Sequence, residues 1–200
     1  MDNKPKKDIL ARLYLVEKKS SAEIANLFKC SVSKINYWLA RYNVSKRSIS
    51  EAVYTRRNPK GDPFVESVLS VKTPNEYFLY GLGLGLYWGE GTKSNTHSIR
   101  LGNTDPKLIR TFIKFLRQIY KIKPDKLKFG LQVFNDVPKI AAKKYWLRQL
   151  QARPSQFQKI VVSPPQGIGT YRKKAQYGVV TVYYHNKKLR DILCHTIDTI

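Results

Sequence analysis

The chain has 200 residues and a mass of 23.2 kDa, which is enough for one medium domain or for a small module joined to a larger one. Its 42% hydrophobic and 12% aromatic content argues against wholesale disorder, while a formal charge of +23 favours a polyanionic partner such as nucleic acid. The longest apolar run, residues 78–88, is well short of the roughly 20 residues that a membrane span needs, so no membrane partner is expected.

The first 48 residues carry three helix patterns. Residues 7–19 place apolar side chains on one face of a helix. Ser20 and Glu23 have the spacing of a capping box that starts a second helix, and Ser31 is a good cap for a third. Two helices joined by a tight turn, with the small Ala25 where they cross, predict a helix-turn-helix.

This segment, about residues 7–48, resembles the resolvase-type helix-turn-helix family, although Lys29 stands where that family usually has glycine. If the third helix enters a major groove, residues near its start contact base edges and Arg41 contacts phosphate. The residues expected to bind DNA here, from the third helix and the basic segment after it, are Ser33, Lys34, Asn36, Tyr37, Arg41, Lys46 and Arg47. The alternative is a solvated three-helix module that binds protein.

A basic stretch, about residues 46–63, contains Pro59, Gly61 and Pro63 and lacks apolar periodicity, so we expect a linker. The chain has 14 basic and 5 acidic residues up to residue 60 and 23 and 9 after it, so both parts are expected to meet nucleic acid. The expected organisation is a helix-turn-helix module over 1–48, a basic linker over 49–72 and a mixed α/β domain over 73–200.

The larger part alternates helix and strand patterns, so the expected fold class of the chain is α+β. Thr73, Pro74 and Glu76 form the start signal of a helix, with Glu76 closing a second capping box. Further along the chain we expect a helix over 104–120, a strand over 126–134, a helix over 137–151, strands over 158–163 and 177–185 joined by a loop, and a helix over 187–199.

The stretch "GLGLGLYWGEG", residues 81–91, follows directly from that helix start. Its spacing matches neither glycine-rich phosphate-binding motif. In a helix, Gly81, Gly85 and Gly89 fall on one face as a groove without side chains. Four glycines, Gly83 included, cost about 4 kcal/mol relative to alanine, which predicts a close backbone approach to a second helix. A neighbouring face is expected to pack into the core through Leu79, Leu82 and Leu86.

Together with "SIRLGNTDPKLIRTFIKFL", this stretch resembles the LAGLIDADG homing-endonuclease family over about residues 76–120. The resemblance implies that the glycine-lined helix forms a two-fold interface and that its final acid, Glu90, binds the metal that cleaves DNA. Mg²⁺ is the expected cofactor, because carboxylate oxygens are its natural ligands in phosphodiester hydrolysis. One motif per chain requires a homodimer. The alternative is that Glu90 is a structural acid on an interface that does not cut.

Two further groups of residues are candidates for phosphate contact, and each is alternatively a solvated surface. Lys126 and Lys128 alternate along one expected strand and are candidates for lining a DNA saddle. The loop between the last two strands offers a phosphate clamp made of Tyr171, Arg172, Lys173 and Lys174.

The leading expectation is a sequence-selective, metal-dependent endonuclease that cleaves double-stranded DNA as a homodimer. The rival is a helix-turn-helix transcription regulator with a degenerate LAGLIDADG domain, which the short segment between Gly91 and Asp105 favours. An intron-RNA maturase is a third possibility. Cys30 and Cys194 lie far apart without a metal-binding or disulfide pattern, which indicates a reduced, cytoplasmic protein.

Overall fold

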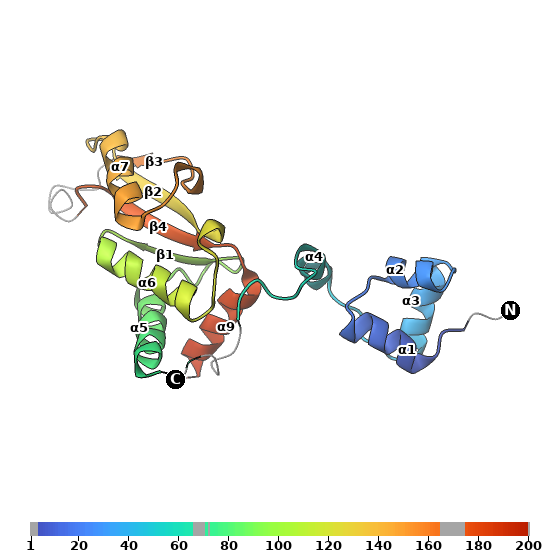
Figure 1. Ribbon diagram of the computed structural model, residues 1–200. Coiled ribbons are helices and arrows are strands. Elements are labelled where there is room, and N and C mark those ends of the chain that lie inside the picture. The colour runs from blue at the N-terminus through green and yellow to red at the C-terminus, as the bar shows by residue number, and fades with distance from the viewer. Residues whose placement is uncertain (1–3, 66–70, 72, 165–174, 200) are drawn as a thin grey trace. The chain divides into compact units, whose positions relative to one another are not determined.

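The computed structural model describes residues 4–65, 71, 73–164 and 175–199. The chain folds into two compact units, Met1–Asp62 and Pro63–Ile200. We call them unit 1 and unit 2, and Figure 1 shows the elements of each. Within the described ranges, none of the helices combines the length and the apolar character that are required to cross a membrane.

Unit 1 begins with three helical segments around a small core. They are α1 (Lys7–Ala11), which continues as one π-helical turn, η1 (Arg12–Val16), followed by α2 (Ser21–Leu27) and α3 (Val32–Arg41). Their inward faces supply Leu10, Leu13, Tyr14, Ile24, Ala25, Ile35, Leu39 and Val44. Ala25 is buried where α2 meets its neighbours, as the need for a small residue at the crossing predicted.

Both expected caps of unit 1 are confirmed. The Ser20 hydroxyl accepts a hydrogen bond from the Glu23 backbone N–H at 3.2 Å, and the Glu23 carboxylate accepts one from the Ser20 N–H at 2.7 Å. The backbone hydrogen bond from Ser20 is also the main reason that the pKa of Glu23 lies below its ordinary value. Ser31 caps α3 by accepting from the Lys34 N–H.

Within the linker expected over 49–72, Ile49–Arg57 forms a helix, α4, which was not predicted. Ser48 caps this helix, and none of its side chains is buried. An apolar pattern could therefore not reveal it. The start of the helix is held by Arg47, whose backbone N–H donates to the Tyr14 hydroxyl at 3.2 Å.

Unit 2 contains helices and one described sheet. In chain order the elements are α5 (Pro74–Glu90), β1 (Ile99–Asn103), α6 (Pro106–Gln118), the 3₁₀ turn η3 (Pro124–Lys126), β2 (Lys128–Phe134), α7 (Lys139–Leu150), the 3₁₀ turn η4 (Pro154–Gln156), β3 (Val161–Ser163), β4 (Val179–Tyr184) and α9 (Lys187–Asp198). The chain is therefore α+β. The predicted capping box of Thr73 and Glu76 is confirmed, with Pro74 in the first turn of α5.

The four strands of this sheet lie in the order β1-β4-β2-β3. β4 is antiparallel to both β1 and β2, whereas β2 and β3 are parallel. Because β2 lies between them, β3 and β4 do not pair with each other, although they are consecutive strands in the chain. β1 had no counterpart among the predicted strands.

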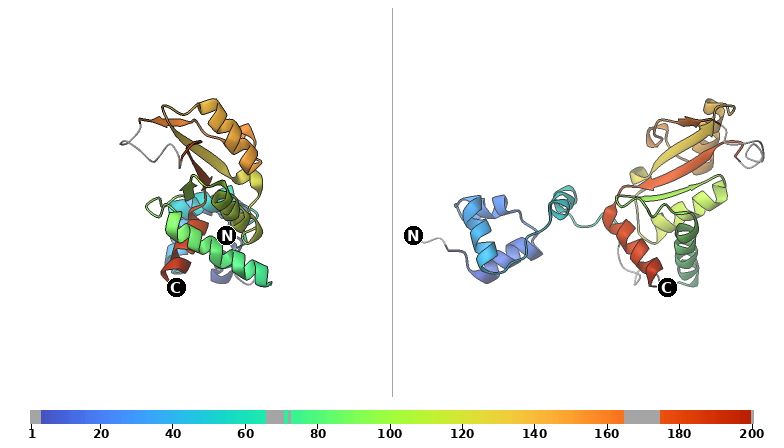
Figure 2. Two further views of the ribbon diagram at one scale, coloured as in Figure 1. Left: turned by 90° about the vertical axis from the view of Figure 1, so that its left-hand side faces the viewer. Right: turned by 180° about the vertical axis from the view of Figure 1, so that it is seen from behind.

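The two faces of the sheet differ in what covers them. Alternate residues of β1, β2 and β4 point into the core, among them Leu101, Leu131 and Val182, each at most 1% exposed. They pack against helix residues such as Phe112 and Trp146. Seen from behind, the strands lie in front of α6 and α7 (Figure 2), so the helices cover one face. Residues of the other face are half-buried or exposed.

Candidate nucleic-acid interface

The third helix of unit 1 presents the side chains that were expected to bind DNA. Ile35 and Leu39 are completely buried, which turns the opposite side of α3 outward. Ser33 is exposed, and Tyr37 is 53% exposed. Lys34, near the start of the helix, is half-buried.

Two of the expected contact residues are held by neighbours. The Asn36 amide oxygen accepts from the Ser21 hydroxyl at 3.0 Å, which ties α3 to α2. Arg41 Nη1 donates to the Tyr37 hydroxyl at 2.8 Å, and its guanidinium lies 5.8 Å from the centroid of Trp38. These contacts fix the orientation of Arg41 at the last turn of α3, while its side chain stays on the exposed surface.

The turn between α2 and α3 has a backbone conformation that glycine usually adopts, but the residue at this position is lysine. Lys29 has a φ of 49°, in the left-handed region. The Cys30 N–H that follows donates to the Ala25 carbonyl at 3.0 Å and closes the end of α2. The turn therefore has the conformation that glycine favours at this position, with lysine in its place.

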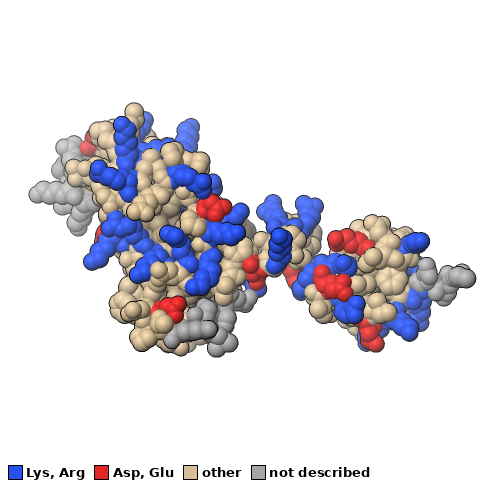
Figure 3. Space-filling model, in the orientation of Figure 1, with Lys and Arg blue, Asp and Glu red and all other residues tan. Residues whose placement is uncertain are grey.

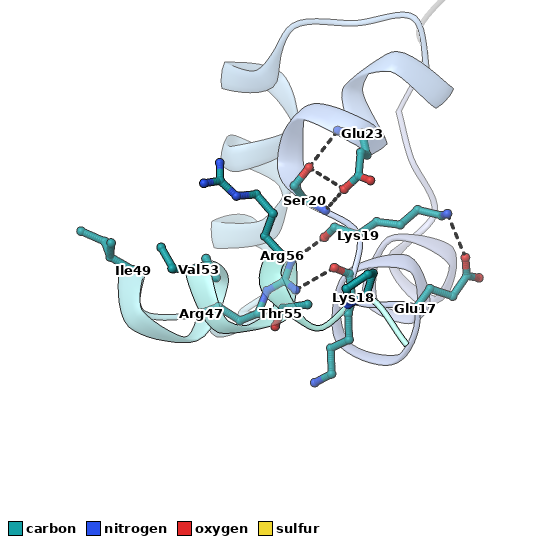
Figure 4. A pocket seen from close by; sticks show the side chains of 12 residues that line it. Glu17, Lys18, Lys19, Ser20, Glu23, Arg47, Ile49, Val53, Thr55 and Arg56 are labelled. Atoms are coloured by element: carbon teal, nitrogen blue, oxygen red, sulfur yellow. Dashed lines mark hydrogen bonds and ion pairs between the residues drawn. The ribbon is translucent and has the colours of Figure 1, made fainter. Parts of the chain in front are cut away.

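Arg47 has a different environment from the one expected of a DNA contact. Its guanidinium donates to the Lys18 carbonyl at 2.8 Å and to the Lys19 carbonyl at 2.5 Å, and lies 4.4 Å from the centroid of the Tyr14 ring. Figure 4 shows this side chain at a groove of about 670 Å³ between the α1–α2 connection and α4. Arg47 thus joins α4 to the rest of unit 1, whereas Lys46 beside it is exposed.

Lysine and arginine side chains spread over the visible surfaces of both units, with few acids between them on unit 2 and more acids on unit 1 (Figure 3). On unit 2, one cluster lies on the face of the sheet that the helices leave uncovered. We call this cluster the open sheet face; it consists of Arg100, Lys128, Tyr183 and His185. Tyr183 of the central strand pairs in register with Arg100 on one side and with Lys128 on the other.

On the open sheet face, the cationic side chains of Arg100 and Lys128 lie beside the aromatic rings of Tyr183 and His185. The Arg100 guanidinium lies 5.4 Å from the centroid of Tyr183, whose ring stacks on that of His185. Burial, together with the positive charges of Arg100 and Lys128, lowers the pKa of His185 below its ordinary value. His185 is therefore mainly neutral at neutral pH. A bound phosphate would favour its charged form.

The two lysines expected on one strand are separated by the structure. Lys128 is the first residue of β2, but Lys126 lies in the 3₁₀ turn η3, so the expectation that both line one strand face was wrong. The interpretation as a strand failed because Pro124 starts a 3₁₀ turn that includes Lys126. The expected phosphate clamp, Tyr171, Arg172, Lys173 and Lys174, lies outside the described residues.

The four central glycines of α5 have two different environments. A Cβ atom built on Gly83 would lie 2.1 Å from the Phe115 ring of α6, so this glycine permits close packing within the unit. A Cβ atom on Gly81, Gly85 or Gly89 would meet no described atom within 4 Å. These three residues form a stripe on the exposed side of the helix.

Large apolar side chains flank that stripe. Phe78 is 72% exposed, Trp88 is 59% exposed and Leu82 is 39% exposed. Leu79 and Leu86 pack into the core as expected, but Leu82 does not. We call the surface formed by Phe78, Gly81, Leu82, Gly85, Trp88 and Gly89 the glycine face of α5. When a helix has apolar side chains on two opposite faces, both faces are buried in most proteins. An apolar face that stays exposed therefore marks an interaction site.

Glu90 is the last residue of α5 and is exposed. Immediately after it, Gly91 forms a bridge to Leu101, and the Thr92 N–H donates to the Arg100 carbonyl at 2.9 Å. These bonds attach the end of the helix to the edge of the sheet beside β1. Glu90, at the C-terminal end of the glycine face, is therefore close in the chain to the backbone contact that Thr92 makes with Arg100 of β1.

The segment that follows Glu90 is anchored by Arg190 of α9, a residue that the sequence did not single out. Its Nε donates to the Asn95 carbonyl at 3.1 Å and its Nη2 donates to the Lys93 carbonyl. Lys93 in turn donates to the Trp88 carbonyl at the end of α5. Nearby, burial raises the pKa of Tyr87 to about 12, so its hydroxyl stays protonated.

Comparison with models of known protein families, with curated proteins and with solved structures finds no match to this chain.

Proposed function

We propose that this chain binds duplex DNA as a homodimer and cleaves it with Mg²⁺ held by Glu90. The observation that carries the proposal is the arrangement at the end of α5. A glycine face that no described residue covers leads directly to the exposed Glu90, and the next residue, Gly91, bridges to Leu101 at the edge of the sheet. The helix-turn-helix pattern of unit 1 supplies a second DNA-binding surface in this proposal.

The residues present fit a magnesium site only if two copies contribute. Mg²⁺ keeps several waters and is typically held by one or two carboxylates together with substrate phosphates. Within the described ranges, no three His, Cys, Asp or Glu side chains lie together. Pairing of two glycine faces around a two-fold axis would bring the Glu90 residues of both copies together. Bound Mg²⁺ would then stabilise charge on the attacking and leaving oxygens.

The positive side chains have separate tasks in this proposal. Arg100 and Lys128 would neutralise phosphates on the open sheet face, and Tyr183 would fix the position of the Arg100 guanidinium. Ser33, Tyr37 and Arg41 would meet DNA through α3. The net charge of +23 supports a phosphate-rich ligand for both units.

The test compares the wild type with Glu90→Gln, which keeps the size of the side chain and removes its charge. Duplex targets are first selected from a random library with the wild-type protein, and both proteins are then incubated with them and Mg²⁺. We expect both to bind with similar Kd and only the wild type to cut. Tight binding without cutting by either protein would overturn the nuclease and leave the DNA-binding part intact.

A non-cutting DNA-binding regulator is the second candidate. The observation that favours it is the short connection between α5 and β1, which makes a single bridge at Gly91 and is held down by Arg190. The LAGLIDADG resemblance implies a longer DNA-contacting hairpin at this place. The cleavage assay above separates the two candidates.

The dimer has its own test, which does not depend on DNA. Gly85→Leu would place a large side chain in the middle of the glycine face, where a Cβ has room within the chain. We expect sedimentation to show a dimer for the wild type and a monomer for Gly85→Leu, with an unchanged circular dichroism spectrum. A variant that sediments like the wild type would refute the glycine face as the interface.

A further inference from the structure

A line of four positive side chains runs along the outer face of α6. Lys107, Arg110, Lys114 and Arg117 follow one another at intervals of three and four residues, and all four are exposed. The opposite face of the helix carries Ile109, Phe112, Phe115 and Leu116, which are fully buried. With a rise of about 1.5 Å per residue, the line is about 15 Å long. We call it the α6 stripe.

Neither α6 nor α7 contains an acidic residue, although Asp105 caps the start of α6 and α5 carries Glu76 and Glu90. Between residues 106 and 164 the chain has 14 lysines and arginines but only two acids, Asp125 and Asp136. Arg110 makes a described side-chain contact, in which its Nη1 donates to the neutral Gln149 amide at 2.5 Å. Like charges three or four residues apart repel one another on a helix and destabilise it. This repulsion is relieved if an external polyanion lies on the stripe.

The α6 stripe and the open sheet face lie on opposite sides of the sheet. The buried residues of β1, β2 and β4 point toward the helices, whereas Arg100, Lys128 and Tyr183 point away from them. Figure 3 shows positive side chains spread over the helical side of unit 2. A DNA segment on the open sheet face therefore leaves the helical side uncovered.

We propose that the α6 stripe is a second duplex-DNA site of unit 2, on the side of the sheet opposite the open sheet face, which contacts phosphates without reading base sequence, so that unit 2 alone holds two DNA segments. A straight row of charges suits the regular phosphates of a duplex. Sites for single strands add aromatic rings on which bases stack, but the aromatic rings of α6 are buried. This goes beyond the function proposed above: it requires DNA as the ligand, but neither cleavage nor Glu90.

The test uses the full chain and two matched double variants. Lys107→Gln/Lys114→Gln removes two charges from the stripe, and Lys139→Gln/Lys159→Gln removes two exposed charges elsewhere in unit 2. A duplex is immobilised, and the protein-dependent capture of a second, labelled 30-base-pair duplex is measured. We expect the stripe variant to lower capture about tenfold and the control variant less than threefold.

Salt dependence gives an independent measurement. Each phosphate contact adds about 0.9 to the steepness of the plot of log K against log salt. For binding to a non-specific duplex, the steepness should therefore fall by the contribution of about two phosphate contacts in the stripe variant. It should stay nearly unchanged in the control variant. Equal losses in the two variants would overturn the proposal, because they would reflect net charge alone. Stronger competition by single-stranded RNA of the same length than by duplex would also overturn it.

The two proposals fail separately. If wild type and Glu90→Gln both bind without cutting but the stripe variant still loses capture, the second DNA site stands and the nuclease does not. If the wild type cuts DNA but captures no second duplex, the nuclease stands and the second site is refuted. Thermal unfolding followed by circular dichroism checks that both double variants remain folded.

Discussion

The two sides of α5 use glycine for different reasons. On the inner side, Gly83 lets the helix approach α6 so closely that a Cβ atom would overlap the Phe115 ring. On the outer side, a Cβ atom on Gly81, Gly85 or Gly89 would have no neighbour within 4 Å among the described residues. Glycine lowers helix propensity equally on both sides. Among the described residues of unit 2, close packing explains the need for glycine on the inner side and not on the outer side.

This difference shows where to look for a missing partner. Glycine in a helix interior costs about 1 kcal/mol relative to alanine, so three glycines without a close neighbour are unfavourable in an isolated chain. The exposed aromatic side chains beside them point to the same conclusion, since apolar surface is normally buried. A second copy of α5 is the partner that would account for both observations.

The largest expected effect comes from the inner side. Gly83→Ala forces a methyl group against the Phe115 ring in the core and should lower the free energy of unfolding by about 1–3 kcal/mol. Urea denaturation measures this loss. Unchanged stability would mean that α5 and α6 are not packed as closely as described, and would remove the basis of the comparison.

The matched substitution on the outer side should have the opposite sign. Gly85→Ala meets no neighbouring atom in the chain and gains helix propensity, so at protein concentrations where the chain is monomeric the free energy of unfolding should rise by about 1 kcal/mol. At concentrations where the wild type is a dimer, the variant should dissociate more readily. A loss of stability in the monomer would show that this face is already in contact within the chain.

The turn between α2 and α3 in unit 1 shows the opposite situation. Lys29 has a left-handed backbone conformation that glycine would adopt at lower cost. Lys29→Gly should raise the free energy of unfolding by up to about 1 kcal/mol, because only glycine adopts a left-handed backbone without steric cost. Ala40→Gly, on the exposed side of α3, is the control and should lower it by about 1 kcal/mol. Thermal denaturation of the two variants distinguishes backbone conformation from a general effect of glycine.

The smallest effect concerns His185 on the open sheet face. Its pKa is below the unfolded value of 6.5, so the unfolded chain takes up a proton first and stability falls as the pH drops below 6.5. DNA should oppose this trend, because phosphate favours the charged ring; affinity should therefore rise between pH 7.5 and 5.5. His185→Gln should weaken both pH dependences. Anisotropy titrations that show the same dependence in the variant would exclude His185 as the cause.

Much of the fold could be predicted because its start signals are local. The capping boxes at Ser20 and Thr73 each depend on side chains three residues apart, and both helices start where expected. The helix over 104–120 was predicted from its apolar spacing and corresponds to α6, and the helix expected over 137–151 corresponds to α7. These features are determined within one or two turns of chain.

The missed elements depend on distant partners. β1 has only two buried apolar residues, Ile99 and Leu101, and its strand pairing comes from β4, about 80 residues later. α4 buries no side chain, so nothing in its periodicity indicates a helix. The internal role of Arg47 depends on two backbone carbonyls at the α1–α2 connection, which no sequence pattern records.

The candidate site divides in the same way. The stripe of Gly81, Gly85 and Gly89 and the place of Glu90 at its end follow from helical periodicity and were predicted, but the exposed apolar side chains beside the stripe were not. Arg100, Tyr183 and His185 come together only through strand register. Alternation of Arg100 with apolar neighbours is the one signal that could have indicated an uncovered sheet face. It was too short to separate from a loop.

The order of strands also constrains how unit 2 reaches its folded state. β4 lies between β1 and β2, although it is the last strand in the chain. Neither neighbour can complete its ladder until residues 179–184 have been synthesised, so β1 and β2 must wait for a strand that comes about 80 residues after β1. Such long-range pairing slows folding. Truncation before β4 should leave β1 and β2 without their shared partner and expose both strand edges to aggregation.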